Sequence, residues 1–317
     1  MNATVMASMP GGYRSRLTHA DPEVRRIAVM ELPYSDEEDF SALALIALHD
    51  TAAAVRVEAA KALEGIEEDA VVKALAAALG DPAPEVREAT AQSLSELKDP
   101  AMSVHIIPFL TDSDAYSRAA AFRALRELRV TGVFEAALAA LGDADSRVRR
   151  EAVSVLGYLK NPAALGELTR VAMNDSDSDV RRIAVGALGY ATDQQVLPAL
   201  ALALRDESWQ VREEAASTLG KVKPRGAIDN LIQALDDPYW QVQIRATRSL
   251  GRMKARESVT AIIEALAHPV SNVRKESAIA LGEIGDAKAI PALEMARQDP
   301  DPDVRKLAQL ALSTIVR

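Results

Sequence analysis

The dipeptide Val-Arg recurs along this chain at an almost constant interval. Eight copies are intact, and Ser117-Arg118 and Val242-Gln243 occupy the two places where the dipeptide is altered. Successive copies are 31 residues apart, except for one interval of 32. A period this strict predicts a row of similar structural units, each packed on its neighbours, instead of one globular core. The ten copies begin at Val24, Val55, Val86, Ser117, Val148, Val180, Val211, Val242, Val273 and Val304.

Three further positions keep the same register. A leucine stands eight residues after the start of every copy. A small residue, usually alanine, stands four residues after the same start. Apolar or small residues at offsets 0, +4 and +8 lie on one face of a helix. Each Val-Arg segment is therefore predicted to be an amphipathic helix, which we call helix B. The residues five positions before each start are His19, Asp50, Asp81, Asp112, Asp143, Asp175, Asp206, Asp237, His268 and Asp299.

A second helix, helix A, is predicted before each helix B. In the clearest example, Ile228, Leu231, Ile232 and Leu235 have the spacing of one helical face. A short turn with aspartate, glycine or proline separates the two helices, and such residues favour helix ends. One pair cannot bury both of its apolar faces, so neighbouring pairs must stack. The glycines expected to end five of the B helices are Gly157, Gly189, Gly220, Gly251 and Gly282.

The sequence of an aspartate, then Val-Arg, then alanine and Leu-Gly resembles the HEAT repeat. The 31-residue length is similar to the short subtype found in phycobilisome bilin lyases. The resemblance covers about ten copies and implies an all-α fold, a right-handed α-α superhelix (a HEAT-repeat solenoid) of about ten helix pairs. It also implies an ion-pair ladder between turn aspartates and arginines, which we expect to be solvated and weak per pair. The expected pairs include Asp50/Arg56, Asp81/Arg87 and Asp143/Arg149.

The same pattern predicts how the chain is organised. A single solenoid is expected over residues 21–317, after an N-terminal cap over residues 1–20 that is partly disordered. The fourth copy departs most from the pattern, so an irregularity is expected near residues 112–143.

Composition narrows the classes of partner. The chain has 37 basic and 46 acidic residues, a net charge of −9, which disfavours duplex DNA and anionic membranes. It has no cysteine, which excludes disulfides and thiolate metal sites. No apolar run approaches the roughly 18 residues of a membrane span, and the N-terminus lacks a signal-peptide pattern. We therefore expect a cytoplasmic protein.

The residues that catalysis would need do not form a recognisable set. The four histidines, His19, His49, His105 and His268, are not paired at metal-ligand spacing. Some HEAT proteins are di-iron hydroxylases that carry His-Glu dipeptides, and this chain has none. Gly11-Gly12 lacks the lysine and hydroxyl partners of a phosphate-binding loop. The sequence predicts no catalytic residue and no metal site. An enzymatic role is expected only if the chain is a bilin-lyase-like protein.

Aromatic and arginine residues gather at the outward offsets of the middle and later B helices. HEAT arrays bind partners along the concave face that the B helices line. Both tryptophans stand two residues before the start of adjacent copies, and three arginines follow the second one. The alternative is that the aromatic rings fill gaps between adjacent B helices. The predicted partner-binding groove consists of Trp209, Trp240, Arg245, Arg248, Arg252, Tyr158, Tyr190, Arg150, Arg182 and Gln241.

Three functions fit these residues. The first is a non-catalytic scaffold that binds an acidic or aromatic-bearing segment of another protein and needs no cofactor. The second, implied by the resemblance, is a bilin-lyase-like chaperone that cradles a tetrapyrrole or another cofactor, whose propionates suit arginine and whose rings suit tryptophan and tyrosine. The third is binding of single-stranded nucleic acid, which the net negative charge opposes.

Overall fold

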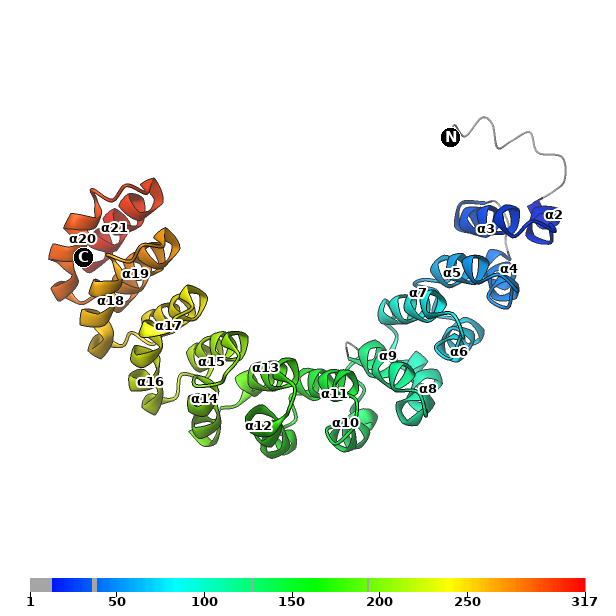
Figure 1. The fold of residues 1–317 in the computed structure, drawn as a ribbon, viewed down its shortest axis with the longest axis horizontal. Coiled ribbons are helices and arrows are strands. Elements are labelled where there is room, and N and C mark those ends of the chain that lie inside the picture. Colours follow the sequence, from blue (N-terminus) through cyan, green and yellow to red (C-terminus); the bar gives the residue numbers. More distant parts are fainter. Residues whose placement is uncertain (1–12, 36–38, 127, 193, 317) are drawn as a thin grey trace. The chain divides into compact units, whose positions relative to one another are not determined.

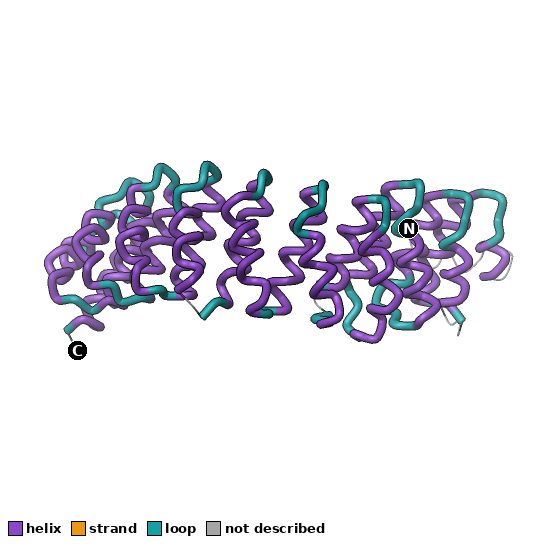
Figure 2. Tube along the Cα trace, turned by 90° about the horizontal axis from the view of Figure 1, so that it is seen from below, coloured by secondary structure: helices purple, strands orange, loops and turns teal. Residues whose placement is uncertain are grey.

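The computed structural model describes residues 13–35, 39–126, 128–192 and 194–316. Every regular element in these ranges is a helix, which confirms the predicted all-α class (Figure 2). The chain divides into two compact units, Met1–Leu159 and Lys160–Arg317, called unit 1 and unit 2 and described separately. The predicted single solenoid over residues 21–317 stays a prediction. Most of the predicted cap over residues 1–20 lies outside the described residues, although α2 begins at Tyr13.

Each unit consists of five helix pairs, so the described chain has the ten pairs that the period predicts (Figure 1). In unit 1 the A helices are α2 (Tyr13–Leu17), α4 (Phe40–Ala47), α6 (Asp69–Ala78), α8 (Ser103–Ile106) and α10 (Phe134–Ala140). Its B helices are α3 (Pro22–Glu31), α5 (Ala53–Ala62), α7 (Pro84–Ser95), α9 (Ala115–Leu125) and α11 (Ser146–Leu159).

Unit 2 repeats this order. Its A helices are α12 (Leu165–Asn174), α14 (Leu197–Ala203), α16 (Ile228–Gln233), α18 (Val259–Ala265) and α20 (Ile290–Ala296). Its B helices are α13 (Ser178–Ala187), α15 (Trp209–Val222), α17 (Trp240–Arg252), α19 (Ser271–Ile284) and α21 (Pro302–Ile315). No described helix is long and apolar enough to cross a membrane.

The apolar stripe of each B helix forms the core of its unit. In α15, Val211, Ala215 and Leu219 stand at offsets 0, +4 and +8, and none of them is exposed to solvent. Turn residues cap several of the B helices, as the sequence predicts. Asp301, for example, accepts a hydrogen bond from the backbone N–H of Asp303, with Pro302 at the first helical position.

Four of the five glycines of the Leu-Gly pairs lie inside their helices, contrary to the prediction, whereas Gly189 follows the end of α13 at Ala187. Gly220 and Gly282 lie inside α15 and α19. A Cβ atom on Gly282 would lie 3.0 Å from the Cα of Ala311 in the next B helix, so the glycine permits close helix packing. The helix ends come later, and α15 is capped by Lys223 in the left-handed conformation with φ 52°.

An ion-pair ladder joins successive copies, as the resemblance implies, but its pairs differ from those predicted. Each of six arginines binds the aspartate carboxylate of the following copy. Its own copy contributes a backbone oxygen instead. Arg212 donates from Nε and Nη2 to the Asp237 carboxylate at 2.6 and 3.0 Å, and from Nη1 to the Asp206 backbone oxygen at 2.8 Å. The ladder pairs are Arg25–Asp50, Arg56–Asp81, Arg118–Asp143, Arg181–Asp206, Arg212–Asp237 and Arg274–Asp299.

These pairs are also less solvated than predicted. The Arg212 and Asp237 side chains keep only 12% and 8% of their exposure. The Asp237 carboxylate also accepts the backbone N–H of Tyr239 at 2.9 Å. Such a carboxylate therefore accepts hydrogen bonds both from its own turn and from the arginine of the preceding copy.

The ladder is interrupted between the third and fourth copies. Arg87 lies 5.4 Å from the centre of the Tyr116 ring, and its buried Nε has no hydrogen-bond partner among the described residues. The preceding A helix is also short: α8 passes at Ile107 into a 3-10 helix, because Pro108 cannot continue the α-helical hydrogen bonds.

The ladder leads to a prediction about stability. Arg212→Ala should lower the free energy of unfolding by about 3 kcal/mol, because it leaves the Asp237 carboxylate buried without its cation. The double variant Arg212→Gln/Asp237→His introduces the residue types that stand at the same places one copy later, Gln243 and His268. It should lower the free energy of unfolding by less, because it leaves no unpaired carboxylate. Urea denaturation measures both. Equal losses would show that the unpaired Asp237 carboxylate costs little and would contradict this reason.

The ladder also predicts how stability depends on pH. Hydrogen bonds from Arg56, Arg25 and Arg274 lower the pKa of Asp81, Asp50 and Asp299 in the folded protein. Because these values lie below the unfolded value of about 3.9, the stabilisation is complete above that pH and is lost as the pH falls below it.

The corresponding variant is Asp81→Asn, which removes one of these titrating groups. Its unfolding free energy, measured by urea denaturation at a series of pH values, should fall less steeply in acid than that of the unaltered protein. Parallel curves would contradict the assignment.

Candidate binding surface

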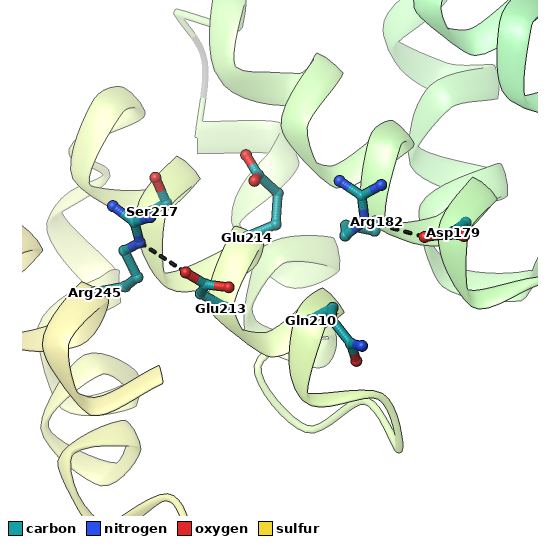
Figure 3. Close-up of a pocket in the computed structure, with 7 residues that line it drawn as sticks. All are labelled: Asp179, Arg182, Gln210, Glu213, Glu214, Ser217 and Arg245. Atoms are coloured by element: carbon teal, nitrogen blue, oxygen red, sulfur yellow. Dashed lines mark hydrogen bonds and ion pairs between the residues drawn. The ribbon is translucent and has the colours of Figure 1, made fainter. Parts of the chain in front are cut away.

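The B helices line the inner side of the curved row of helices within each unit (Figure 1). In unit 2 this side has a hollow of about 450 Å³ between α13, α15 and α17. Figure 3 shows its walls, which consist only of charged and polar side chains. The lining residues are Asp179, Arg182, Gln210, Glu213, Glu214, Ser217 and Arg245.

Neighbouring acids neutralise the two arginines of the hollow. Arg245 donates from Nε to Glu213 at 2.9 Å, and Arg182 donates from Nε to Asp179 at 3.3 Å. Glu214 accepts weaker contacts at its Oε1, from the Thr218 hydroxyl at 3.3 Å and the Lys221 ammonium at 3.5 Å. The hollow therefore offers hydrogen-bonding groups of both signs instead of a surplus of positive charge.

Arg248 is also neutralised, which the sequence analysis missed. It holds the buried Glu276 through two hydrogen bonds, from Nε at 2.9 Å and from Nη2 at 2.6 Å. The hydrogen bond to Glu276 raises the pKa of Arg248. Glu276 stands in the ninth copy, one copy after Arg248.

The two tryptophans have different surroundings. Trp209 stacks on Tyr239, with ring centres 5.5 Å apart and planes 12° from parallel. Tyr239 in turn lies 5.5 Å from the Arg212 guanidinium. Trp240 keeps 38% of its surface exposed. Trp209 thus fits the alternative that aromatic rings fill gaps between copies, while Trp240 is available to a partner. Tyr239, which stands immediately before Trp240, was not among the predicted groove residues.

The other predicted residues of unit 2 are dispersed. Arg252 lines a different hollow, of about 610 Å³, beside Lys223 and Glu257. The Tyr190 hydroxyl donates to the Asn161 backbone oxygen at 2.9 Å, and burial raises its pKa. Gln241 has a buried Oε1 atom with no hydrogen-bond partner in the described part of the chain.

The remaining predicted residues, Arg150 and Tyr158, belong to unit 1. Arg150 donates to Glu151 at 3.2 Å, and the guanidinium groups of Arg126 and Arg129 lie 5.7 and 6.0 Å from the centre of the Tyr158 ring. That they continue the surface of unit 2 stays a prediction. Within the described residues, no group of three or more histidine, aspartate or glutamate side chains could hold a metal ion.

Comparisons with known proteins agree with this architecture. A family model for HEAT repeats matches residues 13–95, 103–184, 167–237 and 228–313, which is most of the chain. No curated protein sequence matches it. The solved structure of E. coli YibA is 22% identical, with a TM-score of 0.62 over 77% of this chain and 91% of that one.

Two further structures are more distant. Kap95p, solved with RanGDP, is 13% identical with a TM-score of 0.64, and all of this chain aligns with 51% of it. Phycocyanin lyase, a complex of CpcE and CpcF from Nostoc, is 22% identical over 69% of this chain and 95% of that one. Its TM-score of 0.46 is too low to carry an argument. These identities support the fold alone.

The pair Arg248–Glu276 leads to a prediction. Arg248→Ala should lower the free energy of unfolding by about 1–3 kcal/mol, because it leaves the Glu276 carboxylate buried without its donor. Adding Glu276→Gln should recover part of the loss, as a double-mutant cycle in chemical denaturation would show. If Arg248→Ala has no effect on stability, the arginine is free for a partner, as the sequence analysis supposed.

Proposed function

We propose, from the premise that this chain belongs to the HEAT-repeat family, that it is a non-catalytic scaffold. Its B-helix surface holds a segment of another protein, and the hollow between α13, α15 and α17 is one of the contact points. We include the cytoplasmic location in this proposal.

The observation that supports it is the polar lining of that hollow. Pockets for small molecules are mostly apolar, with a few polar groups that orient the ligand. All seven side chains around this hollow are charged or polar, and they include arginines, carboxylates, an amide and a hydroxyl. Such a wall suits a peptide, whose backbone and side chains present donors and acceptors along their length. Trp240, half-exposed at the start of α17, adds an aromatic contact of the kind that anchors interfaces.

The structural comparisons add a weaker argument. Kap95p, to which this chain is similar in fold, was solved in complex with the protein RanGDP. In Kap95p a solenoid of similar fold therefore binds a protein, which favours a protein partner here. The other two functions considered, tetrapyrrole and single-strand binding, lack such support. The hollow has no apolar wall for a tetrapyrrole ring, and Tyr239 covers one face of Trp209.

Site-specific photo-crosslinking tests the proposal. A photoreactive residue in place of Ser217, which lines the hollow, should crosslink a partner protein in cells. The matched control places the same residue at Arg170, an exposed position on the A helix α12. Adducts from both positions, or from neither, would contradict the proposal.

A second measurement tests the contact residues. The double variant Trp240→Ala/Arg245→Gln should lose the crosslinked partner, while its melting temperature changes by only a few degrees. We expect little loss of stability because Trp240 is half-exposed and the Arg245–Glu213 pair is partly solvated. A double variant that still captures the partner would place the binding surface elsewhere.

A further inference from the structure

We propose that the hollow beside the ends of α15 and α17 binds an acidic peptide segment that carries an apolar side chain. This inference rests on the proposed scaffold function and names the chemistry of a second contact point in unit 2. The hollow has a volume of about 610 Å³. Its lining residues are Lys223, Ile228, Arg252, Met253, Lys254 and Glu257.

The two chain segments that border this hollow are basic. Residues 221–225, at the end of α15, read Lys-Val-Lys-Pro-Arg, and residues 252–256, one copy later, read Arg-Met-Lys-Ala-Arg. Both segments lie at the C-terminal end of a B helix, whereas the ladder turns lie at its N-terminal end. Because α17 has 13 residues, roughly 20 Å of helix separates the two ends, so the hollow is distinct from the ladder.

The bases of the hollow have no acidic partner. The Lys223, Arg252 and Lys254 side chains are exposed, and none of them forms an ion pair or a hydrogen bond with another described residue. By contrast, Glu276 holds Arg248, one turn earlier in α17, at 2.6 Å. The three bases of the hollow are therefore available to a ligand.

Acids are fewer than bases around the hollow. Glu257 is the one acid among the lining residues, and Asp229 follows the lining residue Ile228 in the first turn of α16. Over residues 223–229 and 252–257 the sequence has five bases and these two acids. A surplus of positive charge on a chain whose net charge is −9 marks a place that attracts anions.

The acids of the next copy do not cancel this surplus. The Asp286 carboxylate accepts the backbone N–H of Lys288 at 2.9 Å. Glu283 faces the inside of α17, where its Oε2 would lie 2.7 Å from a Cβ atom on Gly251. Neither carboxylate forms an ion pair with a base of the hollow among the described contacts.

Two of the bases occupy a strained backbone conformation. Lys223 and Lys254 both have φ 52°, in the left-handed region that disfavours residues with a Cβ atom and suits glycine. Gly285 stands at the same place one copy later, with φ 72°. The chain thus has lysine at two positions where glycine would relieve strain. Because cations also stabilise the C-terminal end of a helix, an experiment has to separate that role from ligand binding.

The occupant we commit to is a peptide with aspartate or glutamate residues on either side of an apolar one. Ammonium and guanidinium groups pair with carboxylates. Ile228 and Met253 give the hollow an apolar part, and methionine adapts its shape to an apolar ligand. Single-stranded nucleic acid is disfavoured, because no aromatic side chain among the lining residues could stack on a base.

Fluorescence anisotropy with the full chain tests the site. The probe is a fluorescein-labelled nonapeptide of three Glu-Glu-Leu repeats, and its neutral counterpart has three Gln-Gln-Leu repeats. The probe should bind, and its affinity should fall as salt is added, while the counterpart should show no comparable binding.

Glycine variants separate ligand binding from stability. Lys223→Gly/Lys254→Gly removes two bases and relieves the left-handed strain, so its melting temperature should be unchanged or higher. Its affinity for the probe should be roughly tenfold weaker, the size expected for two exposed charged contacts. The matched control is Arg129→Gly/Lys160→Gly, which makes the same change at the same offset of the fourth and fifth copies, with φ 52° and 51°. It should bind the probe as the unaltered chain does.

The apolar part of the hollow has its own test. A nonapeptide of three Glu-Glu-Gln repeats should bind about threefold more weakly than the probe, because it lacks the leucines. In the variant Met253→Gln this difference between the two acidic peptides should disappear. An unchanged difference would show that the leucines do not contact Met253.

Three further outcomes would overturn the proposal: equal binding of the acidic and neutral peptides, equal losses in the two glycine variants, or stronger binding of a thymidine oligonucleotide than of the probe at these lysines. The scaffold function is tested separately. A chain that binds the probe here but yields no crosslinked partner from position 217 would refute the scaffold while leaving this site intact.

Discussion

The ladder of arginine and aspartate is the interaction on which the rest of the structure depends. Each aspartate carboxylate accepts the preceding copy's arginine and a backbone N–H of its own turn, as Asp81 does with Arg56 and Ala83. Two helix pairs and the turn between them are thereby fixed to one another. The arginine guanidinium group is planar and donates from two nitrogens. It therefore fixes the orientation of the carboxylate in the next copy as well as its distance.

The packing of successive B helices determines which surface residues meet. Neighbouring B helices are held so that an arginine at offset +6 faces a glutamate at offset +3 of the next copy. This contact occurs in both units, as Arg123–Glu151 and Arg248–Glu276. The charge of the candidate surface is therefore decided between copies. The acid that neutralises Arg248 of α17, Glu276, stands in the following copy.

The same logic explains the tryptophans. Trp209 and Trp240 occupy the same offset in adjacent copies, so the sequence treats them as equivalent. The residue before Trp240 is Tyr239, which stacks on Trp209, so a ring of the eighth copy covers the tryptophan of the seventh. Trp240 keeps 38% of its surface exposed. The difference arises from the neighbouring copy and not from the residues themselves.

The period, the apolar stripe and the turn residues were enough to predict an all-α row of ten helix pairs. These features are local, because helix periodicity and capping depend on residues a few positions apart. Contacts some 25 to 32 residues apart were not predictable in the same way. The partner of each arginine, the burial of Glu151 and Glu276, and the packing role of Gly282 were decided by the tertiary structure, because each depends on the side chains of the next copy.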